Sequence, residues 1–137
     1  MYQLDKQLKQ DTIFIGKSTL CDVLLMNDQR YPWVILVPRQ ADVREVYQLT
    51  EADQLQLNHE SCFVAQAMAR LFMAKKMNVA ALGNVVSQLH IHHIARFDSD
   101  AVWPRPVWGV GTAKRYSDVA ANAMLSQLRR AFADILS

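Results

Sequence analysis

Residues 88–96 carry the sequence QLHIHHIAR, in which His90 and His92 alternate with apolar residues and a third histidine, His93, follows directly. Along an extended strand, successive side chains point to opposite faces of the sheet. One face therefore carries Gln88, His90, His92 and then Ile94, whereas the other is apolar except for His93. We expect the apolar face to pack on the core and the polar face to line a site.

His90 and His92 form the chemical centre of this stretch. Two imidazoles separated by one strand residue have Cβ atoms about 6–7 Å apart, a span that suits a bound phosphate group. One imidazole can attack phosphorus while the other donates a hydrogen bond to a phosphate oxygen. Two histidines and a glutamine on one face are costly to bury without partners, so we interpret this face as functional. We interpret His93, on the apolar face, as a core residue.

The rest of the chain has the patterns of further strands and two helices. Five strands are expected, at Thr12–Gly16, Cys21–Met26, Trp33–Val37, Asn78–Val86 and Gln88–Phe97. A long helix free of Gly and Pro begins after Thr50, which can cap it, and extends to about Lys76. Ser117 is expected to cap a last helix. The expected fold class is α+β: a five-stranded antiparallel sheet with one long helix and a C-terminal helix.

The composition is that of a globular domain. The chain has 137 residues, 51% hydrophobic and 20% charged, so we expect residues 1–137 to form one domain. A net charge of only +2 argues against a DNA partner, because duplex binding needs a concentrated basic face. The N-terminus lacks a signal peptide pattern, and no apolar run is long enough to span a membrane. We expect a cytoplasmic protein with no membrane partner, in which Cys21 and Cys62 stay reduced.

Residues 98–116 form a long segment with no regular pattern. Long loops in compact domains are usually either functional or disordered, and the presence of Trp103 and Trp108 favours an ordered one. These side chains can stack on a base, fasten the loop or pack at a dimer interface, and the sequence leaves all three open.

The histidine stretch resembles the signature of the histidine triad (HIT) family, which is His-φ-His-φ-His-φφ on the last strand of a sheet, with φ apolar. His90 and His92 match the central and third histidines, and Gln88 stands in place of the first. The preceding residues 82–87 resemble the glycine-containing approach to the motif.

Upstream, residues 24–28 and 33–39 (LLMND and WVILVPR) are similar to a pair of strands of the family. In the family, a polar residue between these strands contacts the ribose of the nucleotide, and Asn27 is the best match. The resemblance covers most of the chain from about Thr12 to Arg96.

The resemblance implies a nucleotide ligand and an activity. Family members hydrolyse or transfer nucleotidyl groups, as in dinucleoside polyphosphate or nucleoside phosphoramidate hydrolysis, with no cofactor or metal. His90 would be the nucleophile that forms a nucleotidyl-imidazole intermediate, and His92 would hold the phosphate and orient His90. Asn84 and Ser87 match positions near the phosphate or leaving group. Members are commonly homodimers in which two five-stranded sheets join edge to edge.

Gln88 departs from the family pattern. Glutamine can hydrogen-bond a phosphate but cannot exchange a proton. If the first histidine assists the leaving group, its loss removes acid–base help worth about 10²–10⁴-fold in rate. Activity would then be slow, or limited to leaving groups that need no proton, such as a polyphosphate. Arg96 is a candidate phosphate contact by its charge and position, with ordinary surface charge as the alternative.

Two other functions remain open. A non-catalytic nucleotide-binding or interaction protein would keep the fold without turnover, and only the enzyme would label His90 with a nucleotidyl group. A metal site would need His90, His92 and a distant ligand such as His59, since His-x-His on a strand can ligate zinc.

Overall fold

The computed structural model covers residues 1–137 and is built on a five-stranded antiparallel sheet in the order β1-β2-β3-β5-β4. Its strands are β1 (Thr12–Lys17), β2 (Cys21–Met26), β3 (Trp33–Pro38), β4 (Lys76–Ala80) and β5 (Ile91–Arg96). Its helices are α1 (Lys6–Asp11), α2 (Glu51–Phe72) and α3 (Asp118–Ala131), with a short 3-10 helix η1 (Val46–Gln48). The expected fold class is therefore confirmed.

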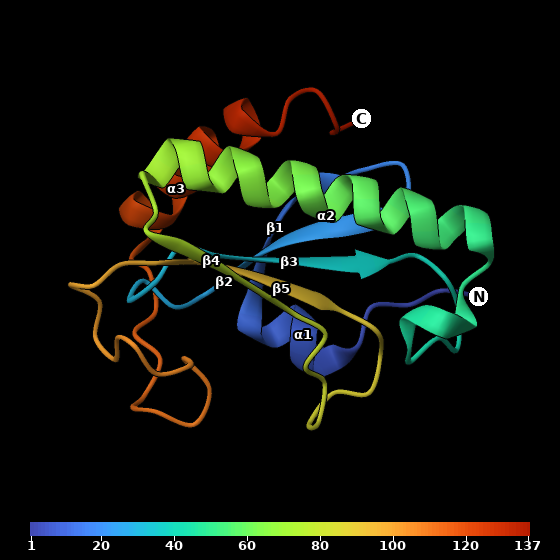
Figure 1. Cartoon of the computed structure of the whole chain (residues 1–137), viewed down its shortest axis with the longest axis horizontal. Helices are drawn as coiled ribbons and strands as arrows, with labels where there is room; N and C mark the ends of the chain where they lie inside the picture. The colour runs from blue at the N-terminus through green and yellow to red at the C-terminus, as the bar shows by residue number, and fades with distance from the viewer.

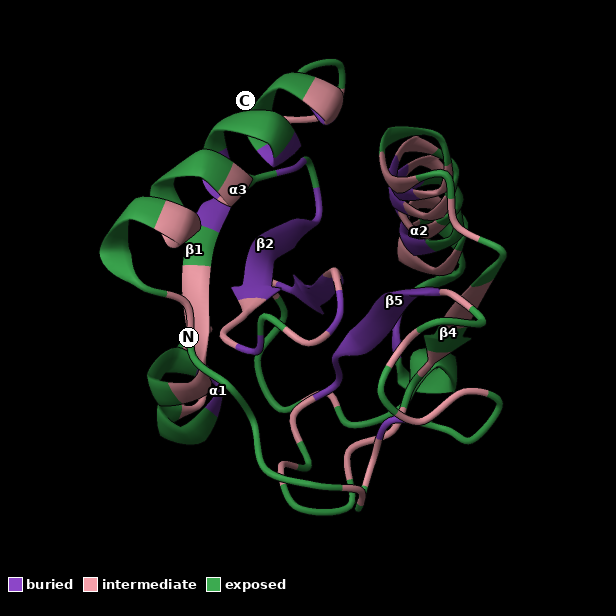
Figure 2. Cartoon of the chain, turned by 90° about the vertical axis from the view of Figure 1, so that its left-hand side faces the viewer, coloured by how far each residue is buried: buried purple, intermediate pink, exposed green.

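Helices α2 and α3 cover one face of the sheet, while α1 and the loop after β5 lie on the other (Figure 1). The end-on view shows the same layers, with α2 and α3 both above the sheet and α1 below it (Figure 2). Strands β3 and β5 are buried along their whole length because both of their faces are covered. Strand β5 lies between β3 and β4, so its side chains project from the interior of the sheet.

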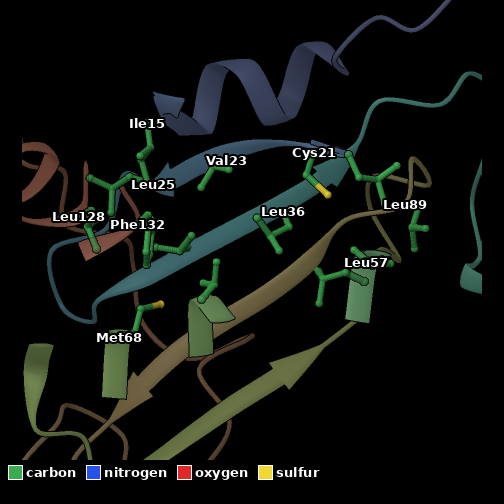
Figure 3. Packing of buried hydrophobic residues seen from close by; sticks show 14 of the residues in the cluster. Ile15, Cys21, Val23, Leu25, Leu36, Leu57, Met68, Leu89, Leu128 and Phe132 are labelled. Carbon is green, nitrogen blue, oxygen red and sulfur yellow. The ribbon is translucent and has the colours of Figure 1, made fainter. Parts of the chain in front are cut away.

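Each face of the sheet has its own apolar cluster, because alternate residues of each strand point to opposite faces. The cluster under α2 and α3 includes Ile15, Val23, Leu36, Met68 and Phe132 (Figure 3). The cluster on the α1 face includes Leu8, Leu24, Ile35, Ile94 and Val107. The N-caps expected for α2 and α3 are present, as Thr50 accepts from the Asp53 amide and Ser117 from the Ala120 amide. No helix combines the length and apolar character that crossing a membrane requires.

The predicted boundaries of α2 and β4 were wrong. Helix α2 ends at Phe72, before Lys76, because Met73 adopts a left-handed conformation (φ 53°) that stops it. The Lys75 amide then donates to the carbonyl oxygen of Arg96 (2.9 Å), so the chain is already beside β5. Strand β4 consequently starts at residue 76 and ends at residue 80, and was predicted at residues 78–86.

Residues 81–90 form an irregular segment between β4 and β5, which we call the approach segment. The fifth strand was predicted from residue 88 to residue 97 and spans residues 91–96. Helix α1 was not predicted. It has six residues with one buried apolar side chain, Leu8, and is held at its start by Asp5, which caps the Gln7 amide.

Candidate functional site

Strand β5 and the approach segment carry the histidines. The predicted division of faces is confirmed, because Leu89 and Ile91 belong to the cluster under α2 whereas Ile94 belongs to the opposite cluster. His90 and His92 line a pocket on the α1 side of the sheet. Their rings meet edge to face, with centroids 4.8 Å apart.

His90 has one ring nitrogen engaged and one free. Its Nδ1 lies 2.6 Å from the backbone carbonyl oxygen of Gln88. A carbonyl oxygen only accepts hydrogen bonds, so Nδ1 carries a proton, and in the neutral ring Nε2 keeps its lone pair. The residue is only 5% exposed, yet its ring lines the pocket. In its neutral form, the His90 ring can therefore act as a nucleophile or a base through Nε2.

His92 has both ring nitrogens engaged by the protein. The indole N–H of Trp33 donates to Nδ1 (3.0 Å), and Nε2 lies 2.9 Å from the carbonyl oxygen of Leu82. An indole N–H can only donate and a carbonyl can only accept, so His92 is neutral with its proton on Nε2. Burial lowers the pKa of His92 to about 4, and the neighbouring His90 acts in the same direction.

The pocket beside these histidines has a volume of about 290 Å³. One wall is α1, which contributes Gln7, Leu8 and Asp11, and other walls come from β3, the approach segment and Trp108. The lining is mainly apolar with a few polar residues, a composition typical of small-molecule sites.

A second pocket of about 290 Å³ adjoins the first, and the two share Asp11, Met26, Trp33 and Trp108. Asn27 lines only this second pocket, where its Oδ1 accepts from the Tyr116 amide (2.9 Å). Asn27, the predicted ribose contact, therefore lies in the pocket next to the histidine pocket.

The approach segment passes close to His90 at Gly83. A Cβ atom at this position would lie 2.5 Å from the Val86 carbonyl oxygen and 3.2 Å from Cε1 of His90. Asn84 lines the histidine pocket, and together with Ser87 and His90 it also lines a smaller pocket of about 140 Å³. The structure thus brings both predicted phosphate contacts of this segment to the surroundings of His90.

The side chain of Gln88 forms hydrogen bonds with the N-terminal segment. Its Nε2 donates to the Gln3 carbonyl oxygen (2.9 Å), and its Oε1 accepts from the Asp5 amide (2.9 Å). The side-chain amide of Gln88 therefore holds the residues that lead into α1, although Gln88 also borders the smaller pocket near His90.

Arg96 does not line either pocket. It is 1% exposed, forms two hydrogen bonds with Asp100 (2.7 and 3.1 Å) and donates to Asn78 (2.9 Å). Trp103 packs over its guanidinium group, 5.6 Å away. The phosphate contact predicted for Arg96 thus has no support in its surroundings, and Trp103 fastens the loop whereas Trp108 lines the pocket.

His93 is the core residue that its face predicted. It is fully buried, with Nε2 2.8 Å from the Ser61 hydroxyl of α2 and Nδ1 3.2 Å from the Val34 carbonyl oxygen. Burial lowers its pKa to about 4. The structure contains no group of three metal-ligating side chains, and His59 is an exposed residue of α2.

Trp33 and the α1 residues are site components that the sequence reasoning missed. Trp33 was treated only as part of a buried strand, and nothing in one sequence signals that its N–H meets a histidine of another strand. Asp5 followed by Lys6-Gln7-Leu8 does carry a helix-capping signal that could have located α1.

Residues 7–99 match the HIT domain family. A crystallised histidine triad protein from Marinobacter aquaeolei VT8 is 46% identical, with a TM-score of 0.97 and coverage of 98% of both chains. A histidine triad (HIT) protein from Sinorhizobium meliloti 1021 is 43% identical, with a TM-score of 0.93 over 95% of this chain and 96% of that one.

A histidine triad protein from Bradyrhizobium japonicum is 45% identical, with a TM-score of 0.92 over 94% of this chain and 96% of that one. No curated protein matches the chain. The family match covers more than half of the chain, and the three solved relatives extend the likeness over nearly all of it. The chain therefore belongs to the histidine triad (HIT) family.

Proposed function

We propose that the protein is a nucleotide-binding hydrolase or nucleotidyl transferase that acts through a nucleotidyl-His90 intermediate. The observation that carries this proposal is the hydrogen bond between Nδ1 of His90 and the Gln88 carbonyl oxygen (2.6 Å). In the neutral ring, it leaves the Nε2 lone pair free in a residue that lines the pocket, which is the state that a histidine nucleophile needs. Membership of the HIT family supports the same chemistry.

The reaction has two steps. First, the Nε2 lone pair of His90 forms a bond to phosphorus, and the bond from phosphorus to the leaving group breaks with its electron pair on the leaving group. Second, water or another acceptor attacks phosphorus, the phosphorus–nitrogen bond breaks and its electron pair returns to Nε2. The attacking water gives up its proton to solvent, and hydrolysis releases a nucleoside monophosphate.

The leaving group in this proposal departs without a proton from residue 88. Gln88 cannot exchange a proton, and its amide is already bonded to the N-terminal segment. A polyphosphate is stable as an anion, so dinucleoside polyphosphates are the favoured substrates. The leaving group of a phosphoramidate is an amine, which needs a proton to depart, so we expect a phosphoramidate to react more slowly.

Asn84 and Ser87 are proposed to bind the phosphate or the leaving group, because both line the space around His90. The nucleoside is proposed to occupy the adjoining space near Asn27, with Trp108 at the boundary of the two pockets. Arg96 is proposed as a structural residue, since Asp100 and Asn78 already occupy its guanidinium group.

The proposed protein is a homodimer, as the family resemblance implies. Strands β1 and β4 are the edges of the sheet, and each leaves one row of backbone groups without a strand partner. Such an edge is a template for pairing with another chain, which supports an edge-to-edge dimer.

A non-catalytic nucleotide-binding protein is the second candidate. The observation in its favour is that Gln88 and His92, two of the three motif positions, use their polar side-chain atoms in hydrogen bonds within the protein. Only His90 keeps a free ring nitrogen, so binding without turnover is compatible with the same pocket.

The deciding experiment follows AMP release from diadenosine polyphosphates and from adenosine phosphoramidate. We expect His90→Ala to lower the rate by at least about 10³-fold, because the covalent step is lost. His59→Ala, which changes an exposed histidine of α2, is the matched control and should keep the wild-type rate. If the wild-type protein binds AMP but releases none from any of these compounds, the non-catalytic candidate replaces the enzyme.

A further inference from the structure

Trp33 gives its only polar group to the histidine pair. It is the first residue of β3, is 6% exposed, and its Nε1 donates to Nδ1 of His92 across the sheet (3.0 Å). We propose that Trp33 is a positioning residue of the reaction, which holds His92 as the neutral Nε2–H tautomer and so fixes the surface against which His90 rests. This inference depends on the proposed function for its kinetic consequence, but not for the state of His92.

The two partners of His92 select a single ring orientation and a single protonation state. Trp33 offers a donor at one side of the ring, and Leu82 offers an acceptor at the other. If the ring turned by 180°, carbon atoms would replace the nitrogens and both hydrogen bonds would be lost. If Nδ1 gained a proton, two N–H groups would face each other at the Trp33 contact. The Trp33 donor and the Leu82 acceptor together exclude both alternatives, and Trp33 is the partner that opposes a proton on Nδ1.

The neutral state of His92 matters because His90 becomes positively charged during the reaction. His90 keeps its Nδ1 proton, donated to Gln88, so bonding of Nε2 to phosphorus makes the ring a cation. The two ring centroids are 4.8 Å apart, and a second cation at that distance would oppose the covalent step. A neutral His92 removes this repulsion and packs its ring edge to face against the nucleophile.

No other polar side chain takes part in this arrangement. The titratable groups around His92 are His90 beside it, His93 on the opposite face of β5, and Asp11 on the α1 wall of the pocket. None of them bonds a nitrogen of His92. The N–H of His92 is already bonded to Leu82 and is not available to a substrate phosphate. Other pocket residues must therefore make the phosphate contact that the family resemblance assigns to His92.

Trp108 supplies a matched comparison for Trp33. Its ring also packs on His92, with centroids 5.1 Å apart at 79°, but its buried Nε1 has no hydrogen-bond partner. Replacing either tryptophan by phenylalanine removes one indole from the surroundings of His92. Only Trp33→Phe also removes a hydrogen bond to its ring.

The test combines nitrogen NMR of the histidine rings with steady-state kinetics. In wild type we expect one His92 tautomer with its proton on Nε2. Trp33→Phe keeps the Leu82 acceptor but removes the donor that opposes a proton on Nδ1. We therefore expect a raised His92 pKa, and a kcat lowered by about 10–10²-fold with a smaller change in KM. Trp108→Phe should keep the wild-type His92 tautomer and leave the His92 pKa near its wild-type value. An unchanged His92 pKa in Trp33→Phe, or a raised pKa with an unchanged kcat, would overturn the proposal.

Two further arms separate the possible failures. If Trp33→Phe does not fold, 3-benzothienylalanine at position 33 keeps the bicyclic ring and replaces the N–H by sulfur, and the same outcomes apply. If wild type shows no turnover with any substrate, the proposed function fails and with it the kinetic role of Trp33. The NMR spectrum of the variant still decides whether Trp33 sets the state of His92.

Discussion

For an individual histidine in this fold, the partners of its two ring nitrogens decide what it can do. His93 bonds Ser61 and the Val34 carbonyl inside the core, and His92 bonds Trp33 and the Leu82 carbonyl. Each of these rings is fully satisfied, so neither has a lone pair for chemistry. His90 has one nitrogen bonded and one free, and this difference singles it out among chemically identical side chains.

The position of the His90 ring depends on Gly83. An added methyl group would meet the Val86 carbonyl oxygen at 2.5 Å, a backbone atom that cannot rotate away, so the approach segment must shift. We expect Gly83→Ala to lower kcat/KM by about 10²-fold, because a displacement of about 1 Å in a nucleophile has such an effect. The measurement is AMP release under the conditions used for His90→Ala.

Gly16→Ala is the control for this substitution. Its added methyl group would meet only the end of the Leu136 side chain, at 3.2 Å, on the opposite side of the sheet from the pocket. We expect a near-normal rate for this variant. Equal losses in the two variants would show that the effect of Gly83→Ala is on general stability and not on His90.

Among the elements, those with strong periodic patterns were predictable and the pocket walls were not. The alternation of residues 89–95 placed Leu89 and Ile91 on the core face correctly, because period 2 leaves only two choices. Helix α1 was not predicted because six residues with one buried leucine have no measurable periodicity. Trp33 contacts a residue 59 positions away in the chain, and Gln88 contacts residues more than 80 positions away. No local sequence pattern encodes such contacts.

Helix α1 forms one wall of the pocket and is held there by Gln88. Gln88→Ala removes the bonds to Gln3 and Asp5, each worth about 1 kcal/mol, so the segment before α1 should open more often. We expect faster hydrogen exchange in residues 1–11 and unchanged exchange in β3, together with weaker AMP binding.

The matched control for this measurement is Gln40→Ala, which removes an exposed hydrogen bond to Asp53 far along the chain from α1. It should leave the exchange of residues 1–11 as in wild type. Unaltered exchange in Gln88→Ala would mean that Leu8 and the apolar contacts alone hold α1 on the sheet.

In the molecule as a whole, two buried histidines, His92 beside the pocket and His93 in the core, make stability depend on pH. His92 and His93 are buried neutral, and burial lowers the pKa of each to about 4. In the unfolded chain a histidine titrates near pH 6.5, so between pH 6.5 and 4 the unfolded state binds more protons than the folded state. Stability is therefore fully present above pH 6.5 and is lost as the pH falls toward 4.

We expect the free energy of unfolding to fall by about 2 kcal/mol for each of these two histidines between pH 7 and pH 5. Burial raises the pKa of Asp100, but its hydrogen bonds, chiefly to Arg96, lower it to about 2, so Asp100 keeps its stabilising effect from pH 7 to pH 5 and loses it only at more acidic pH. Urea denaturation at the two pH values measures the difference, and His93→Gln should remove about half of it, since it deletes one of the two titrating groups. A free energy of unfolding that stays constant from pH 7 to pH 5 would mean that burial does not hold these histidines neutral. That result would also contradict the proposed role of Trp33, which depends on a neutral His92.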